Sequence, residues 1–116
     1  MRLGNFTAGG GKAEITVMTF PGDVGGLLAN VNRWRDQAGL SPVDAAGLAK
    51  ATEQVSVSGT PAMLVEAIGA ANGSLSVYHP ADGLTWFYKM SGPSDVVTAE
   101  KGAFMEFVQS IRFPKP

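Results

Sequence analysis

The chain of 116 residues has the length of one domain and carries nine basic and ten acidic side chains, for a formal net charge of −1. This balance excludes the long-range attraction to nucleic acid or to an anionic membrane that a strongly basic protein has. The absence of cysteine excludes disulfides, thiolate catalysis and cysteine-ligated zinc. Hydrophobic residues make up 45% of the sequence, and 15 glycines and 7 prolines interrupt it, so we expect a single domain over residues 1–116 with many short turns.

The sequence predicts neither a targeting segment nor a membrane span. No apolar run follows a basic cluster after Met1, so we expect no signal peptide, and no window approaches the ~18 apolar residues that a spanning helix needs. The compartment, the oligomeric state and the presence of a further segment ahead of Met1 all stay open.

The first half of the chain predicts a hairpin followed by two helices. Residues 2–7 and 13–20 are strand-like runs separated by a short glycine-rich loop. Residues 24–38 carry apolar side chains at the spacing of an amphipathic helix, namely Leu27, Val31, Trp34 and Ala38. Ser41 and the proline after it are typical of a helix start, which predicts a second helix over residues 43–51.

The second half predicts an antiparallel meander and a last helix. Turn-forming glycine, proline and asparagine residues separate strand-like runs at 53–58, 61–68, 74–79 and 84–91. These runs are apolar on both faces, which indicates a sheet covered by helices on both sides. A wide apolar stripe predicts a docked helix over residues 95–111. The expected fold is therefore α+β, with a mainly antiparallel twisted sheet of about six strands and helices packed on it.

The expected turns set a register for the meander. If Asn72-Gly73 is a two-residue turn, Glu66 lies opposite His79, and a four-residue loop after His79 places Val77 beside Trp86. This register predicts that Trp86 is buried in the sheet core, on the face that also carries Ile68, Leu75, Val77, Tyr88 and Met90. It also brings a carboxylate to the only histidine of the chain.

Several strings of the sequence resemble a known family. They are Met-Arg-Leu-Gly-Asn-Phe at 1–6, Phe-Pro-Gly-Asp at 20–23, Asn-Val-Asn-Arg-Trp-Arg at 30–35, Thr-Trp-Phe-Tyr-Lys-Met-Ser-Gly-Pro at 85–93 and Ser-Ile-Arg-Phe at 110–113. In these strings the chain resembles a family of uncharacterised bacterial proteins that are often predicted to be lipoproteins or exported. The order of hairpin, helix, meander and final helix also resembles the PsbP-like α/β/α sandwich shared by photosystem II extrinsic subunits and a Ran-binding factor. The resemblance implies protein binding and favours the cell envelope or periplasm.

The octapeptide 30–37 is the main candidate for a site. Around one tryptophan it places two Asn, two Arg, an Asp and a Gln, which supply the fork-shaped donors and amide pairs of a fixed polar network. One interpretation is a partner surface built from Asn30, Asn32, Arg33, Arg35 and Gln37. A second is structural, with Trp34 in the core and the arginines bonded to nearby carbonyls or to Asp36 and Asp44. A third, with a thin electrostatic footprint, is anion or nucleic-acid binding by the arginine pair. We expect Arg33 to serve the scaffold and Arg35 to be the more exposed.

His79 and Glu66 form the candidate acid–base pair, although a lone histidine at a strand end is more often structural. With one histidine and no cysteine, we expect no metal site. The glycine runs lack the spacing of a phosphate loop, so we expect no cofactor.

These observations predict a non-enzymatic binding or accessory module with a protein partner and no nucleic acid. Two alternatives stay open. One is a small-molecule-binding or hydrolytic enzyme that uses His79, Glu66 and Lys89, and the other is a structural subunit that assembles through its sheet edge.

Overall fold

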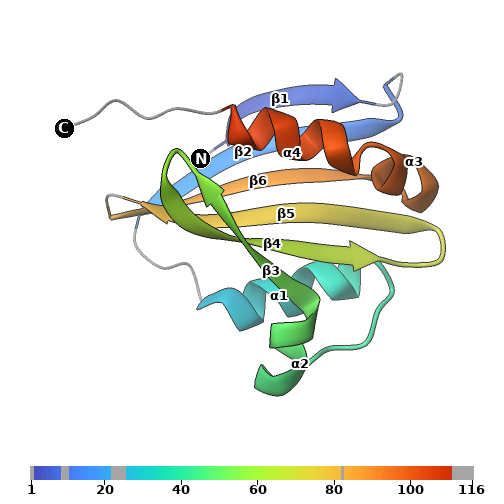
Figure 1. Cartoon of the computed structure of the whole chain (residues 1–116). Coiled ribbons are helices and arrows are strands. Elements are labelled where there is room, and N and C mark those ends of the chain that lie inside the picture. Colours follow the sequence, from blue (N-terminus) through green and yellow to red (C-terminus); the bar gives the residue numbers. More distant parts are fainter. Residues whose placement is uncertain (1, 9–10, 22–25, 82, 111–116) are drawn as a thin grey trace.

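The computed structural model describes residues 2–8, 11–21, 26–81 and 83–110. Figure 1 shows the elements, which are β1 (Arg2–Ala8), β2 (Ala13–Pro21), α1 (Gly26–Gln37), α2 (Ala45–Ala51), β3 (Thr52–Val57), β4 (Thr60–Ile68), β5 (Asn72–Ala81), β6 (Leu84–Pro93), α3 (Ser94–Ala99) and α4 (Lys101–Gln109).

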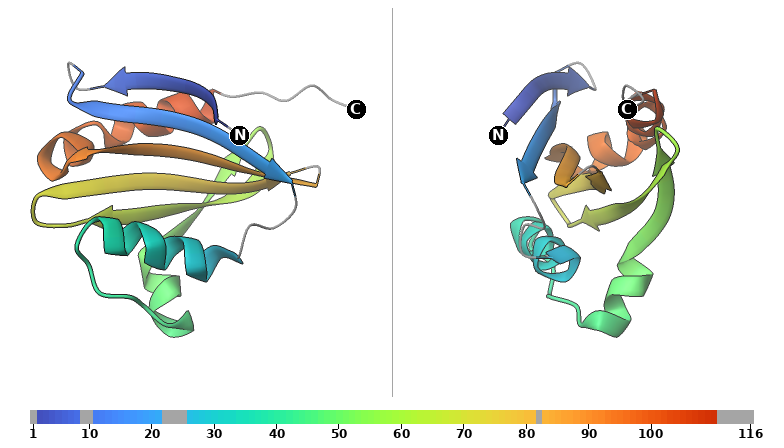
Figure 2. Two further views of the ribbon diagram at one scale, coloured as in Figure 1. Left: turned by 180° about the vertical axis from the view of Figure 1, so that it is seen from behind. Right: turned by 90° about the vertical axis from the view of Figure 1, so that its left-hand side faces the viewer.

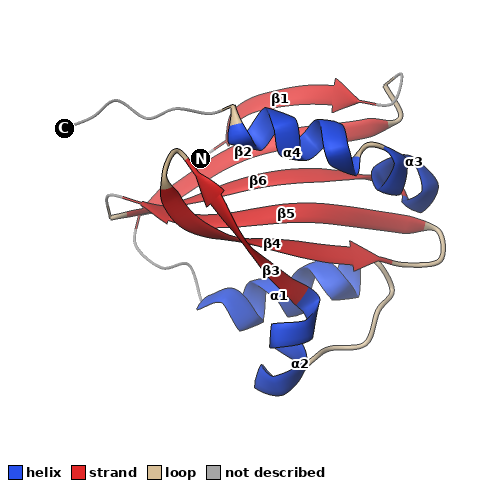
Figure 3. Cartoon of the chain, in the orientation of Figure 1, coloured by secondary structure: helices blue, strands red, loops and turns tan. Residues whose placement is uncertain are grey.

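The described strands form one antiparallel sheet in the order β1-β2-β6-β5-β4-β3 (Figure 3). The N-terminal hairpin therefore joins the meander through the pairing of β2 with β6. The segment that holds α1 and α2 connects β2 to β3. β3 is an edge strand of the described sheet, at the end opposite β1. The predicted α+β class and the antiparallel sheet with helices packed on it are confirmed.

Helices cover both faces of the sheet (Figure 2), as the apolar alternation predicted. On the first face, which we call the α4 face, α3 and α4 contribute Val97, Phe104 and Val108 to a cluster. The sheet contributes buried residues that include Leu64, Leu75, Val77, Tyr88 and Met90. Burial of this large apolar surface supplies the main stabilisation of the sheet.

On the second face, which we call the α1 face, Val31 and Trp34 of α1 pack against Val65, Ala67 and Phe87. The rings of Trp34 and Phe87 meet edge to face, with centroids 5.8 Å apart. Leu27 and Ala38 pack at the margin of the same cluster, so the predicted apolar stripe of this helix is confirmed. The predicted first residues of the helix, 24 and 25, lie outside the described part.

The start of the second helix differs from the prediction. Asp44, and not Ser41, is the N-cap of α2, because its Oδ1 accepts from the backbone N–H of Gly47 (2.8 Å). Residues 41–43 stay outside the helix because side chains of α1 bind their backbone, as described below. Such long-range contacts leave no local signal in the sequence.

The predicted single helix over residues 95–111 is wrong at Glu100. This residue has φ −96° and ψ 7°, so the chain bends between α3 and α4. Gly102, a weak helix former, lies two residues beyond the bend. Backbone hydrogen bonds still span the bend, from Glu100 N–H to Val96 O and from Phe104 N–H to Glu100 O. Ile111, the predicted helix end, lies outside the described residues.

The predicted register of β4 and β5 is also wrong. Ile68 pairs with Gly73 and Glu66 pairs with Leu75, so the turn comes before Asn72. The cause is the packing of α1: a Cβ at Gly69 would lie 1.9 Å from the carbonyl oxygen of Ala38. Only glycine allows this approach, and it fixes the turn at the end of α1.

The predicted loop after β5 is two residues too long. Pairing continues to Ala81 and Leu84, so Val77 lies beside Tyr88, and Trp86 lies between Thr19 and His79. Trp86 is half-buried at the margin of the α4-face cluster, where its ring stacks on Tyr88. The expectation that Trp86 is buried in the sheet core is therefore wrong, although its face was predicted correctly.

Candidate functional site

Asn32 fixes the connection between α1 and α2. Its Nδ2 donates to the carbonyl of Val43 (2.9 Å), and its Oδ1 accepts from the Val43 N–H (2.7 Å). One amide side chain thereby satisfies both backbone groups of a residue 11 positions away. The role of Asn32 in the structure is to hold the linker against the helix.

The two arginines have the opposite roles to those expected. Arg35 is half-buried, and its Nε donates to the carbonyl of Ser41 (2.7 Å), so it ties the same linker. Arg33 is exposed, and its charge acts on Lys89. The structural interpretation is thus confirmed for Arg35 and wrong for Arg33.

Two further members of the string, Asn30 and Trp34, are buried against the α1 face. Asn30 is buried with 2% of its surface exposed, and Trp34 is buried with 3% exposed. Gln37 is exposed, and its Oε1 accepts from Lys89 Nζ on β6 (2.8 Å). The five candidate residues therefore surround the helix and do not form one site.

His79 is fully buried at the end of β5 and belongs to a hydrogen-bond chain. The hydroxyl of Thr60 donates its one proton to the carbonyl of Val57 (2.8 Å), so it accepts from His79 Nε2 (2.5 Å). His79 Nδ1 then accepts from the hydroxyl of Tyr88 (3.2 Å). This arrangement fits a neutral imidazole, and burial lowers the pKa of His79 and raises the pKa of Tyr88.

Glu66 does not meet His79. It pairs across the strands with Leu75, four residues before His79 on β5, which is about 13 Å along the strand. Its Oε1 accepts instead from Lys101 Nζ on α4, and this bond raises the pKa of Lys101. The predicted acid–base pair is wrong because the turn between β4 and β5 lies earlier than expected.

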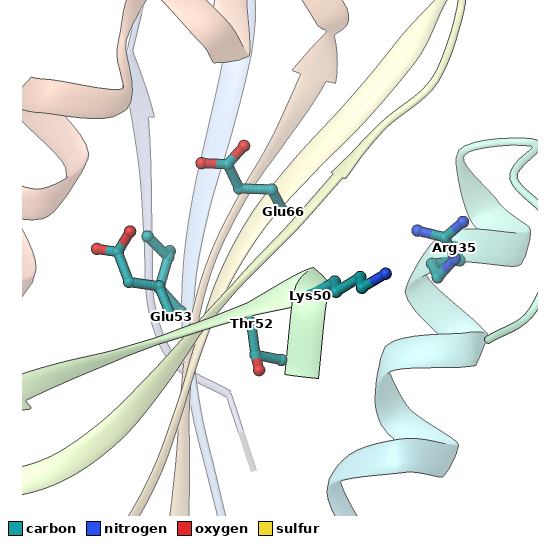
Figure 4. Close-up of a pocket in the computed structure, with 6 residues that line it drawn as sticks. Arg35, Lys50, Thr52, Glu53 and Glu66 are labelled. Carbon is teal, nitrogen blue, oxygen red and sulfur yellow. The ribbon is translucent and has the colours of Figure 1, made fainter. Parts of the chain in front are cut away.

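A polar cleft of about 390 Å³, which we call the edge cleft, opens where the edge strand β3 begins. Its lining comes from α1, α2, β3 and β4, and consists of Arg35, Lys50, Thr52, Glu53, Leu64 and Glu66. Figure 4 shows Lys50 extending toward Arg35, while the carboxylates of Glu53 and Glu66 lie on the other side. Positive and negative side chains thus line separate parts of one cleft.

The charges of the edge cleft are unequally paired within the described part of the chain. Glu66 has Lys101 as its partner, and the charge of Glu53 also acts on Lys101. Lys50 has no hydrogen bond or ion pair with a described residue, and Arg35 uses only its Nε. The cationic side therefore keeps donors available for a ligand.

Sequence analysis identified Arg35 and Glu66 but missed Lys50, Thr52 and Glu53. The only local signal was a charged residue on each side of the junction between α2 and β3. Such residues are common on protein surfaces, and only the three-dimensional arrangement brings them to Arg35.

No protein-family model and no curated protein matches this chain. Among the described residues, no three His, Asp or Glu side chains gather as a group that could hold a metal ion. No helix in the described part is long and apolar enough to cross a membrane.

Proposed function

We propose that this chain is a non-enzymatic binding module that holds a charged segment of a protein partner in the edge cleft. The observation that carries the proposal is the separation of charge along this cleft, with Arg35 and Lys50 on one side and Glu53 on the other. A segment with an acidic and a basic side chain would form an ion pair on each side.

The position of β3 supports a protein segment as the ligand. Within the described sheet, β3 pairs only with β4, so it is an edge strand beside the cleft. An extended segment could therefore pair with the β3 backbone while its side chains enter the cleft. Main-chain pairing would supply affinity, and the charges would supply specificity.

The placement of the acid–base candidates favours binding over hydrolysis. His79 is buried and hydrogen-bonded to Thr60 and Tyr88, whereas Glu66 is bonded to Lys101. The two groups therefore do not converge on one pocket. A general base must lie within hydrogen-bond reach of a substrate, and neither arrangement favours that.

The proposal extends to the fold family and the location. We assign the layers of helix, sheet and helix to the PsbP-like α/β/α sandwich, whose relatives bind proteins. The two covered faces and the sequence resemblance support this assignment. The bacterial cell envelope is proposed from the resemblance alone.

A pull-down from the native host with the whole chain as bait tests the proposal. We expect a protein that the wild type captures to be lost with Lys50→Glu and with Glu53→Lys, because each substitution reverses the charge on one side of the cleft. Glu106→Lys, at an exposed position of α4 outside the cleft, is the matched control and should keep the partner.

Two results would contradict this function. One is capture that persists in both cleft variants, and the other is equal loss in the Glu106→Lys control, which would indicate a nonspecific charge effect. A mass measurement in solution identifies the case in which the captured protein is a second copy of this chain joined through a sheet edge.

A further inference from the structure

A second polar pocket, of about 220 Å³, lies between α1 and strands β5 and β6. We call it the Lys89 pocket, and it shares no lining residue with the edge cleft. Its lining is Trp34, Gln37, Ala38, Asn72, Gly73, Ser74, Lys89, Ser91 and Gly92. The wall therefore combines a tryptophan and an alanine with two hydroxyls, two amide side chains and one ammonium group.

One cation, Lys89, lines this pocket, and a second, Arg33, lies on α1 outside the lining. Lys89 is half-buried, and its Nζ donates to Gln37 Oε1 (2.8 Å), which leaves two of its three donors for other partners. Arg33 lies one helical turn before Gln37, on the same side of α1. Its charge acts on Lys89.

The described residues leave this positive charge uncompensated. Neither Arg33 nor Lys89 forms an ion pair there, since the described salt bridge is that of Lys101 with Glu66. Burial and the charge of Arg33 both lower the pKa of Lys89, and no carboxylate of a described residue acts against them. A ligand of negative charge would remove this repulsion as it binds.

The sheet beneath Lys89 has a further unmet polar group. Ser76 pairs with Lys89 across β5 and β6, so both side chains are on the α1 face. Ser76 is fully buried, and its hydroxyl has no hydrogen-bond partner in the described structure. The polar groups around Lys89 are therefore not fully satisfied by the chain itself.

We propose that the Lys89 pocket binds a small molecule through an oxyanion, a carboxylate or phosphate group held between Lys89 and Arg33. The hydroxyls of Ser74 and Ser91 lie in the same pocket as additional donors, and Trp34 supplies an apolar wall. This site is separate from the edge cleft, so the module has one surface for a protein segment and one for a small anion.

An NMR titration of the whole labelled chain tests the proposal, with inorganic phosphate and succinate as separate probes. Sodium chloride of equal ionic strength is the reference. We expect saturable shifts for the amides of Gln37, Ser74, Lys89 and Ser91 with at least one probe. Binding of one probe and not the other identifies the headgroup.

Substitutions make the titration specific. Lys89→Gln should abolish the shifts, and Arg33→Gln, at an exposed position, should weaken binding about tenfold or more by removing a charge-assisted contact. Lys89→Arg should retain binding because the charge is kept. Lys101→Gln, on α4 and outside the lining of both pockets, is the matched control and should bind like the wild type.

The proposal is overturned if neither probe gives saturable shifts at this pocket, or if the shifts survive Arg33→Gln and Lys89→Gln unchanged. It is also overturned if Lys101→Gln weakens the shifts as much as Lys89→Gln does. None of these outcomes depends on the partner of the edge cleft, so the two proposals fail separately.

Discussion

The two faces of the sheet are built differently. Among the described residues, the α4 face buries twelve hydrophobic residues in one cluster, whereas the α1 face buries five. The smaller core leaves space that polar groups occupy, including Asn30, Asn32 and Lys89. Both the edge cleft and the Lys89 pocket take part of their lining from α1. The α4 face therefore mainly stabilises the fold, whereas the Lys89 pocket lies on the α1 face and the edge cleft takes side chains from both faces at the β3 edge.

Phe104→Ala should have the largest effect on stability among the variants that test this difference between the two faces. Phe104 is 1% exposed in the α4-face cluster, so its truncation should lower the free energy of unfolding by about 3–5 kcal/mol. Phe107→Ala, on the same helix but half-buried, is the matched control and should cost about 1–2 kcal/mol. Urea denaturation measures both. If both substitutions lowered the free energy of unfolding equally, Phe104 would not be at the centre of a closely packed α4 face.

A smaller effect is expected where α1 meets the turn between β4 and β5. Gly69→Ala places a Cβ against the backbone oxygen of Ala38, so the helix or the turn must shift, at about 1–3 kcal/mol. Gly102→Ala, in α4 with open space around it, is the control and should be neutral or stabilising by up to ~1 kcal/mol. If Gly69→Ala melted at the wild-type temperature, the end of α1 would not be packed against this turn.

A still smaller effect is expected in the polar string 30–37 of α1, where a side chain that bonds the linker can be compared with an exposed one. Asn32→Ala leaves the N–H and carbonyl of Val43 without partners and should cost about 1–2 kcal/mol. Arg33→Ala, one residue further, removes an exposed side chain and should change stability by less than about 0.5 kcal/mol. Thermal melts of the two variants, measured side by side, check this. A larger loss in Arg33→Ala would restore the scaffold role that the sequence suggested.

The features of the fold that depend on local sequence patterns could be predicted from the sequence. The strand runs, the amphipathic stripe of α1 and the apolar alternation of β4 to β6 all reflect short-range periodicity, and each is confirmed. The assignment of faces survived the error at the loop after β5, because a register shift of an even number of residues leaves every side chain on its face.

Several of the errors arose where contacts between distant residues determine the structure. The turn before Asn72 depends on the approach of Ala38 to Gly69, and the late start of α2 depends on Asn32 and Arg35 binding the linker. The register error then created the false pairing of Glu66 with His79. Lys50 and Glu53 gave only a weak local signal, because the residues of a cleft built from four elements have no fixed spacing in the sequence.

The smallest expected effect is a pH dependence that originates from the α4 face, where His79 lies. Burial lowers the pKa of His79 below its ordinary value of 6.5, so the unfolded chain binds a proton more readily than the folded one. The contribution of His79 to stability is complete above pH 6.5 and is lost as the pH falls from there toward the lowered pKa. The two hydroxyls that hydrogen-bond to the ring carry no charge in this range, because Thr60 does not titrate and the pKa of Tyr88 is raised.

The melting temperature of the wild type should therefore decrease between about pH 7.5 and 5.5 more than that of His79→Gln, which keeps a donor and an acceptor but does not titrate. The sequence contains no other histidine, so the difference between the two slopes reports this residue. Equal slopes would mean that His79 has the same pKa in the folded and the unfolded protein, despite its hydrogen bonds to Tyr88 and Thr60. In that case burial on the α4 face would not shield His79 from protonation, and the closed packing assigned to this face would not hold at His79.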